Sequence, residues 1–110
     1  SKHVVPGMRK RRRGSIINLA SVEGLEGMES QAAYNASKGG VVLLTRNMAC
    51  DFGPDGVRVN CLCPGYIETP MTQLLREEAL KPVHNRFLGL HLLGRSGQPE
   101  EVAGAALEIL

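Results

Sequence analysis

The sequence has 110 residues, about the length of one ordinary domain, and its 43% hydrophobic and 22% charged residues are close to soluble globular averages. A formal net charge of +2 is too small to argue for a nucleic-acid partner, and the scarcity of aromatic residues weakens any case for base-stacking surfaces. No apolar run approaches the ~20 residues of a membrane span, and the start does not have the pattern of a signal peptide.

The first predicted element is the end of a helix within residues 2–13. Val4 and Met8 are helically spaced, five consecutive basic residues follow at positions 9–13, and Gly14 is the expected stop. The basic run is either a nucleic-acid or nuclear-import patch or a solvated helix end. We favour the helix end, because cations suit the negative end of the helix dipole.

Residues 15–20 form a short apolar run that predicts a buried parallel strand. The loop over residues 21–31 follows the carboxyl end of that strand, the edge at which open α/β sheets bind ligands. A long helix is then predicted from about Gln31 to Phe52. Leu44, Met48 and Phe52 are spaced as one apolar stripe of this helix.

The rest of the chain is less regular. Residues 57–63 predict a second strand, which Pro64-Gly65 ends, and residues 72–80 predict a short helix that Pro82 interrupts. A last helix is expected over 98–110, where a proline and two acids stand in the first turn.

Alternating helices and strands favour an α/β fold with parallel strands, part of a doubly wound, Rossmann-like sheet. Two strands make a poor sheet by themselves. Because the sequence begins at a helix end and stops within a helix, we expect it to be a piece of a larger domain whose N-terminal half is absent.

The cysteines Cys50, Cys61 and Cys63 are odd in number and follow no secretion signal, so they do not indicate a disulfide framework. No further ligands at suitable spacing suggest a metal site. We expect buried, inert thiols and a reduced, cytoplasmic compartment.

Tyr34 and Lys38 are four residues apart on the predicted long helix, so they share one face. An ammonium group beside a tyrosine favours the phenolate, which makes such a pair a sensible acid/base device. Ser21 lies at the carboxyl end of the first predicted strand, where its hydroxyl could reach a substrate oxygen. By itself the Tyr-x-x-x-Lys spacing is weak, since a solvated lysine beside a packed tyrosine is commoner.

The wider pattern strongly resembles the short-chain dehydrogenase/reductase family. The matching features are Asn18 and Ser21, the run Tyr34-Asn35-Ala36-Ser37-Lys38, the turn 53–56, the strand start 57–60, Pro64-Gly65 with Thr69, and the tail 92–110. The resemblance implies that residues 1–110 are the C-terminal portion of a single NAD(P)-binding Rossmann-fold domain.

The resemblance also implies roles for three residues. In this family the tyrosine is the general acid/base, which implies Tyr34. The lysine lowers the pKa of the tyrosine and hydrogen-bonds the nicotinamide ribose, which implies Lys38. The serine orients the substrate oxygen, which implies Ser21. The activity implied is hydride transfer between NAD or NADP and a small-molecule alcohol or carbonyl substrate.

Cofactor-binding residues are implied by the same resemblance. Besides Tyr34 and Lys38 they are those of the loop after the second strand, which in this family surrounds the nicotinamide carboxamide: Pro64, Gly65, Tyr66, Ile67 and Thr69. The family commonly pairs the long helix between subunits, so a homo-oligomer is expected. No nucleic-acid or membrane partner is expected.

Several family features are missing from the 110 residues. They lack the glycine-rich phosphate loop, the residue that selects NAD or NADP, the catalytic asparagine and the last strand. We therefore expect this piece alone to be inactive and to bind the dinucleotide weakly. Two alternatives stay open: a non-catalytic or truncated family member serving in assembly or regulation, and a basic nucleic-acid-binding segment. Glu23 and Glu68 are interpreted as exposed loop acids, and His84 and His91 receive no role.

Overall fold

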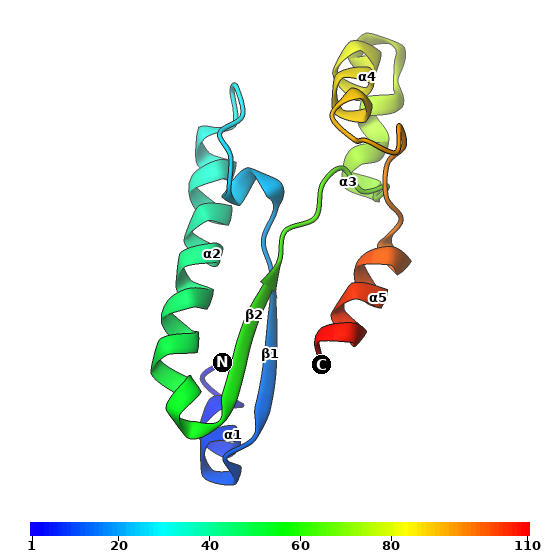
Figure 1. The fold of residues 1–110 in the computed structure, drawn as a ribbon. Helices are drawn as coiled ribbons and strands as arrows, with labels where there is room; N and C mark the ends of the chain where they lie inside the picture. The colour runs from blue at the N-terminus through cyan, green and yellow to red at the C-terminus, as the bar shows by residue number, and fades with distance from the viewer. The chain divides into compact units, whose positions relative to one another are not determined.

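The computed structural model describes all residues 1–110 and divides them into two compact units. The first unit comprises Ser1–Cys63 with Ile109–Leu110, and the second comprises Pro64–Glu108. The helices and strands, labelled in Figure 1, are α1 (Val5–Arg11), β1 (Gly14–Leu19), α2 (Ala32–Phe52), β2 (Val57–Leu62), α3 (Pro70–Gln73), α4 (Lys81–Gly89) and α5 (Pro99–Ile109). Short 3-10 turns lie at Val22–Gly24, Gly53–Asp55, Leu74–Arg76 and Glu78–Leu80.

The first unit is a parallel β-α-β unit. β1 and β2 pair in parallel from Gly14 opposite Val57 to Leu19 opposite Leu62, and α2 connects them. Figure 1 shows α2 running along the strand pair. The predicted α/β class with parallel strands is confirmed, and the strand bounds differ from the predicted ones by one residue.

A small apolar core lies between α2 and β2. Its buried members are Met48, Val57 and Val59, and Val57 is only 1% exposed. Partly buried neighbours from α1, β1 and α2 surround them: Met8, Ile16, Ala49 and Phe52. Because the apolar side chains of four consecutive elements meet here, this core fixes α2 against the sheet.

The predicted apolar stripe of the long helix is wrong at Leu44, which is 55% exposed. The buried positions of α2 are Val42, Thr45 and Met48, spaced three residues apart. The inward face is therefore centred on Thr45, and Leu44 lies to one side of it. A sheet of two strands covers only this narrow row of the helix.

Helix α1 ends earlier than predicted. Arg12 adopts a left-handed conformation with φ 53°, and its N–H bonds to the carbonyls of Met8 and Arg9, so the helix ends at Arg11, three residues before Gly14. Gly14 instead begins β1, where a Cβ atom would lie 2.6 Å from the Met8 sulfur. The basic run is an exposed helix end, and Arg9 pairs with Asp55 at 2.5 Å.

The second unit contains a helix that the sequence did not predict. Pro82 does not interrupt a helix but stands in the first turn of α4. Proline is tolerated there because the first backbone N–H groups of a helix have no intrahelical partner. The single helix predicted over 72–80 is instead divided among the end of α3 and two 3-10 turns. No helix of the chain has the length and apolar character needed to cross a membrane.

Candidate active site

Ser21 is the second residue after β1 in the first unit. The backbone N–H of Ala20 still bonds to Leu62 O at 2.8 Å, so the strand pairing continues to the residue before Ser21. The Ser21 hydroxyl oxygen accepts from Glu23 N at 3.1 Å and caps the 3-10 turn that follows. Ser21 is buried, at 8% exposure, and its O–H hydrogen has no acceptor within the chain. It can therefore donate to an incoming oxygen.

The loop after Ser21 is fixed against the start of α2. The Asn35 side chain donates from Nδ2 to Glu23 O at 2.5 Å and to Glu26 O at 2.9 Å, and its Oδ1 accepts from Met28 N at 3.2 Å. At Gly24 a Cβ atom would lie 2.7 Å from Lys38 O, so only glycine permits this close approach. These contacts hold the loop at one position on the helix.

Tyr34 and Lys38 occupy the inward side of α2. With Thr45 they are spaced at i, i+4 and i+11, which returns to the same face of a helix. The Lys38 ammonium lies 5.8 Å from the centre of the Tyr34 ring, and Nζ donates to Leu19 O at 3.4 Å. Lys38 thus links Tyr34 to the end of β1, two residues before Ser21. Tyr34 is 36% exposed, and its hydroxyl has no partner within the chain.

A hydrogen bond between Asn18 and Thr45 joins β1 to α2 near these residues. Asn18 Nδ2 donates to Thr45 Oγ1 at 2.9 Å, and the same hydroxyl donates to Val41 O at 2.7 Å. Thr45 is 3% exposed, so this bond joins β1 to α2 away from water. Buried hydrogen bonds are costly to leave unmade, which favours a single arrangement of strand and helix here.

The cysteines differ from the prediction of three buried thiols. Cys50 is exposed, and Cys61 and Cys63 are half-buried. Burial raises the pKa of the Cys63 thiol, and Cys61 raises it further, whereas a backbone hydrogen bond at Ser21 acts in the opposite direction. A thiol with a raised pKa is a weak nucleophile at neutral pH. No cluster of potential metal ligands occurs in the chain.

The residues predicted to surround the nicotinamide all lie in the second unit, so contacts within that unit organise them. Tyr66 is held through both its backbone and its side chain. Its N–H donates to His91 Nε2 at 2.9 Å, and its hydroxyl lies 2.7 Å from His84 Nδ1. Its ring also lies 5.5 Å from that of Phe87. Two further backbone bonds, Gly97 N to Tyr66 O and Glu68 N to Gly97 O, hold the strand-like segment at Ile67.

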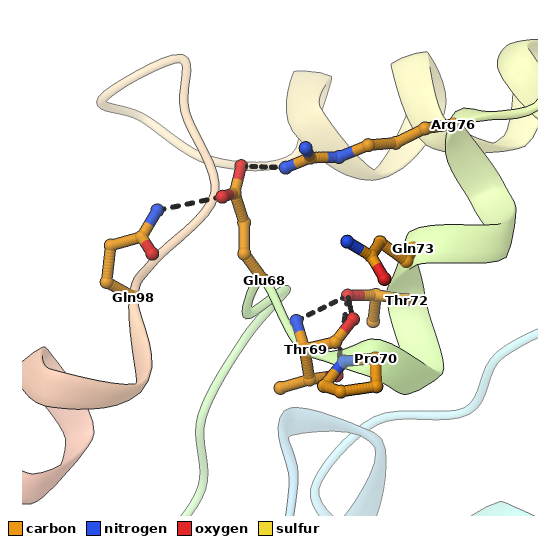
Figure 2. Close-up of a pocket in the computed structure, with 7 residues that line it drawn as sticks. All are labelled: Glu68, Thr69, Pro70, Thr72, Gln73, Arg76 and Gln98. Atoms are coloured by element: carbon orange, nitrogen blue, oxygen red, sulfur yellow. Dashed lines mark hydrogen bonds and ion pairs between the residues drawn. The ribbon is translucent and has the colours of Figure 1, made fainter.

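Glu68 is not the exposed loop acid that the sequence suggested. Its carboxylate accepts from Gln98 Nε2 and Ser96 Oγ, both at 2.9 Å, and forms an ion pair with Arg76. Figure 2 shows the carboxylate between Arg76 and Gln98. The hydrogen bonds from Gln98 and Ser96, followed by the charge of Arg76, lower the pKa of Glu68. Glu68 thus joins three segments of the second unit.

A cavity of about 220 Å³ lies beside α3 and is lined in part by Thr69, Thr72 and Arg76 (Figure 2). Thr69 and Thr72 cap the first turn of α3 reciprocally, with Thr69 N donating to Thr72 Oγ1 at 2.9 Å. Pockets for drug-sized ligands span ~300–1,000 Å³, so this cavity is too small for a dinucleotide. Of the predicted site residues only Thr69 lines it.

A parallel β-α-β unit with a serine after the first strand and a tyrosine–lysine pair on the connecting helix defines a Rossmann-type α/β protein. A family model described as enoyl-(acyl carrier protein) reductase matches residues 1–110. The chain belongs to the short-chain dehydrogenase/reductase family, as the C-terminal part of its Rossmann-fold domain.

Individual relatives agree with this assignment. The chain is 47% identical to the inactive 2-(S)-hydroxypropyl-CoM dehydrogenase 2 of Xanthobacter autotrophicus, over all of this chain and 49% of that protein. It is 46% identical to the 3-oxoacyl-[acyl-carrier-protein] reductase FabG of Thermotoga maritima, over 94% of this chain and 41% of that one. The chain therefore spans about half the length of the curated relatives it matches, or less.

A solved structure from Beutenbergia cavernae is also similar. It is provisionally assigned as an NAD(P)-dependent gluconate 5-dehydrogenase and contains NADP at low occupancy. The TM-score is 0.90 at 35% identity, over 99% of this chain and 43% of that chain. The fold of the chain thus matches part of a dinucleotide-binding protein.

Sequence reasoning missed Asn35, His84 and His91. Asparagine is a poor helix former. Its presence beside Tyr34 in a long helix therefore indicates that its side chain bonds to a nearby backbone group, and this was the available signal. The two histidines gave no such signal. Their partner, Tyr66, is 18 and 25 residues away along the chain.

Proposed function

We propose that this chain carries the proton-transfer residues of an oxidoreductase that interconverts an alcohol and a carbonyl compound using NAD or NADP. The observation that carries the proposal is the contact of Lys38 with both the Tyr34 ring and the carbonyl of Leu19, beside Ser21. Family membership supports the reaction class.

Each residue has a distinct role in this proposal. The free Tyr34 hydroxyl exchanges a proton with the substrate oxygen, and the Lys38 charge favours the phenolate that results. The Ser21 O–H, which has no acceptor within the chain, donates to the same substrate oxygen. Its Oγ is held in place because it accepts a hydrogen bond from Glu23 N. When bound, the nicotinamide supplies the hydride donor or acceptor.

The residues present fit a nicotinamide cofactor. Lys38 uses one of its three N–H donors on Leu19, which leaves donors for a ribose hydroxyl. In the second unit the Ile67 N–H donates to no group of the chain, so it can bond a carboxamide. Pro64, Gly65, Tyr66 and Thr69 are the other residues of this unit that we propose to contact the cofactor.

The remaining expectations rest on the resemblance and on composition. They are a single Rossmann-fold domain, a small alcohol or carbonyl substrate, a cytoplasmic location and a homo-oligomer. For the oligomer, Leu43 and Leu44 on the outer side of α2 are 66% and 55% exposed, which suits burial in a subunit interface.

The test is Tyr34→Phe in the whole protein. We expect kcat to fall about 10²–10⁴-fold, the usual contribution of a general acid/base, with the Kd for the dinucleotide unchanged. The matched control is Ser37→Ala, which removes an exposed hydroxyl from the same helix and should leave kcat within about twofold. Near-normal turnover of Tyr34→Phe would reject the role of Tyr34.

A second candidate function is a non-catalytic family member that serves in assembly or regulation. The relative at 47% identity is named an inactive dehydrogenase, so such proteins exist close to this sequence. This reading predicts a folded wild-type protein that binds the dinucleotide but turns over no alcohol or ketone from a broad panel.

A further inference from the structure

The hydrogen bonds of His91 fix its protonation state. Nε2 lies 2.9 Å from Tyr66 N, and Nδ1 lies 2.8 Å from Phe87 O. The first partner is a backbone N–H, which can only donate, and the second is a carbonyl, which can only accept. Only the neutral imidazole with its hydrogen on Nδ1 satisfies both bonds. A second proton, on Nε2, would face the Tyr66 N–H and remove that bond.

We propose that His91 is a positioning residue for the Pro64–Thr69 loop, and that this loop binds the nicotinamide cofactor tightly only while His91 is neutral. The inference rests on the proposed function, which gives the loop its contact with the cofactor. We call the hydrogen bond between Tyr66 N–H and His91 Nε2 the latch, and protonation of His91 on acidification would open it.

Gly65 is the feature that allows His91 to reach the loop. A Cβ atom at Gly65 would lie 2.6 Å from His91 Nε2, well inside van der Waals contact. The imidazole therefore occupies the space of the missing side chain and bonds the next backbone N–H along the chain. The Pro64-Gly65-Tyr66 turn and His91, two residues after α4, thus fit together at one point.

His84 contacts the same tyrosine but does not depend on its own protonation. Its Nδ1 lies 2.7 Å from the Tyr66 hydroxyl. A hydroxyl can donate or accept, so this bond survives in either charge state of the imidazole. Burial, aided by Glu68 and opposed by Arg76, raises the pKa of Tyr66, which keeps its hydroxyl protonated.

No carboxylate is paired with His91 to offset a positive charge. The titratable groups around it are Tyr66 from the loop and, across the Tyr66 ring, His84 from α4. Glu68 and Arg76 act on Tyr66 from the loop and the turn after α3, and they pair with each other. Protonation of His91 would therefore cost one hydrogen bond and gain no ion pair.

The first experiment measures the Kd of the dinucleotide for the whole protein at pH 7.5 and pH 5.5. Protonation of His91 removes its bond to the Tyr66 N–H, so we expect the wild-type affinity to be lower at pH 5.5 than at pH 7.5. His91→Gln keeps an acceptor oxygen and does not titrate, so its affinity should change by less than about twofold. His84→Gln is the matched control and should retain the wild-type pH dependence.

The second experiment measures hydrogen exchange of the Tyr66 amide in the same proteins without cofactor. Protection should fall on acidification in the wild type and not in His91→Gln. Protection that does not depend on pH would overturn the latch itself. Parallel loss of affinity in wild type and His91→Gln would overturn its link to the cofactor, whereas failure of the proposed function would appear separately as full turnover by Tyr34→Phe.

Discussion

The two compact units of the chain are stabilised by different kinds of contact. The first unit buries Met48, Val57 and Val59 in an apolar core between a helix and a sheet. In the second unit the buried residue is the polar Ser96, and large apolar side chains such as Leu92 and Leu93 are exposed. Polar networks hold that unit together, around Glu68, between Arg95 and Glu101, and between Tyr66 and two histidines.

This difference separates the proposed functions as well. Tyr34, Lys38 and Ser21 are set by elements that an apolar core supports, so their geometry should be insensitive to pH and salt. The loop from Pro64 to Thr69 is set by charges and imidazoles, which respond to both. We therefore expect changes in the first unit to affect stability and turnover, and changes in the second to affect cofactor affinity and acid resistance.

The largest expected effect on stability is that of Val57→Ala. Val57 is the most completely buried side chain, and removal of two methyl groups from a packed core should lower the free energy of unfolding by about 2 kcal/mol. Urea denaturation measures the change. Leu25→Ala, at an apolar side chain of the same unit that is 59% exposed, is the control and should change stability by less than about 0.5 kcal/mol. Equal effects of the two substitutions would mean that the core does not govern the first unit.

Gly65→Ala should have a smaller and more specific effect. The added Cβ would displace the His91 ring from the Tyr66 N–H, so cofactor affinity should fall about tenfold at pH 7.5 and lose its dependence on pH. Titration of the dinucleotide at two pH values checks both points. Gly89→Ala at the end of α4, where a new Cβ meets no atom within 4 Å, is the control. A pH-dependent affinity retained in Gly65→Ala would contradict the latch.

The smallest expected effect concerns acid resistance at the start of α5. Two bonds from Arg95, followed by one from Gln98 N, lower the pKa of Glu101 from 4.5 to about 2. Because the folded pKa is depressed, these contacts stabilise the unit fully above about pH 4.5 and are lost as the pH falls toward about 2.

Glu101→Gln should therefore reduce helicity at pH 6 slightly and flatten the loss of helicity between pH 4.5 and pH 2. Circular dichroism during acid titration measures this, and Glu100→Gln, which removes a neighbouring charge, is the control. An unchanged acid transition in Glu101→Gln would show that this ion pair does not hold the start of α5.

Much of the first unit could be predicted from the sequence, because its signals are local. Short apolar runs predicted both strands, and four-residue spacing placed Tyr34 and Lys38 on one helix face. The error at Leu44 arose because a helical period alone does not say how wide a surface will cover the helix. Two strands cover the row through Thr45 and leave Leu44 exposed.

The second unit could be predicted far less well. Pro82 was interpreted as a helix interruption, because the sequence alone does not show whether a proline stands in the first turn of a helix or in its interior. The loop residues were recognised through family resemblance, but their supports were not. The contact of His91 with Tyr66 joins residues that are 25 positions apart. It also depends on which imidazole nitrogen carries the hydrogen, and the spacing of residues in a sequence does not reveal that.

The three hydrogen bonds of Asn35 bear on how this protein can diversify. Its side-chain amide forms hydrogen bonds with backbone atoms of Glu23, Glu26 and Met28 and not with their side chains. An insertion or deletion between residues 23 and 28 would break that frame, whereas new side chains at Leu25, which is 59% exposed, and at Gly27, which faces open space, would not. The side chains of this loop can thus change by substitution, while the length of the loop stays fixed.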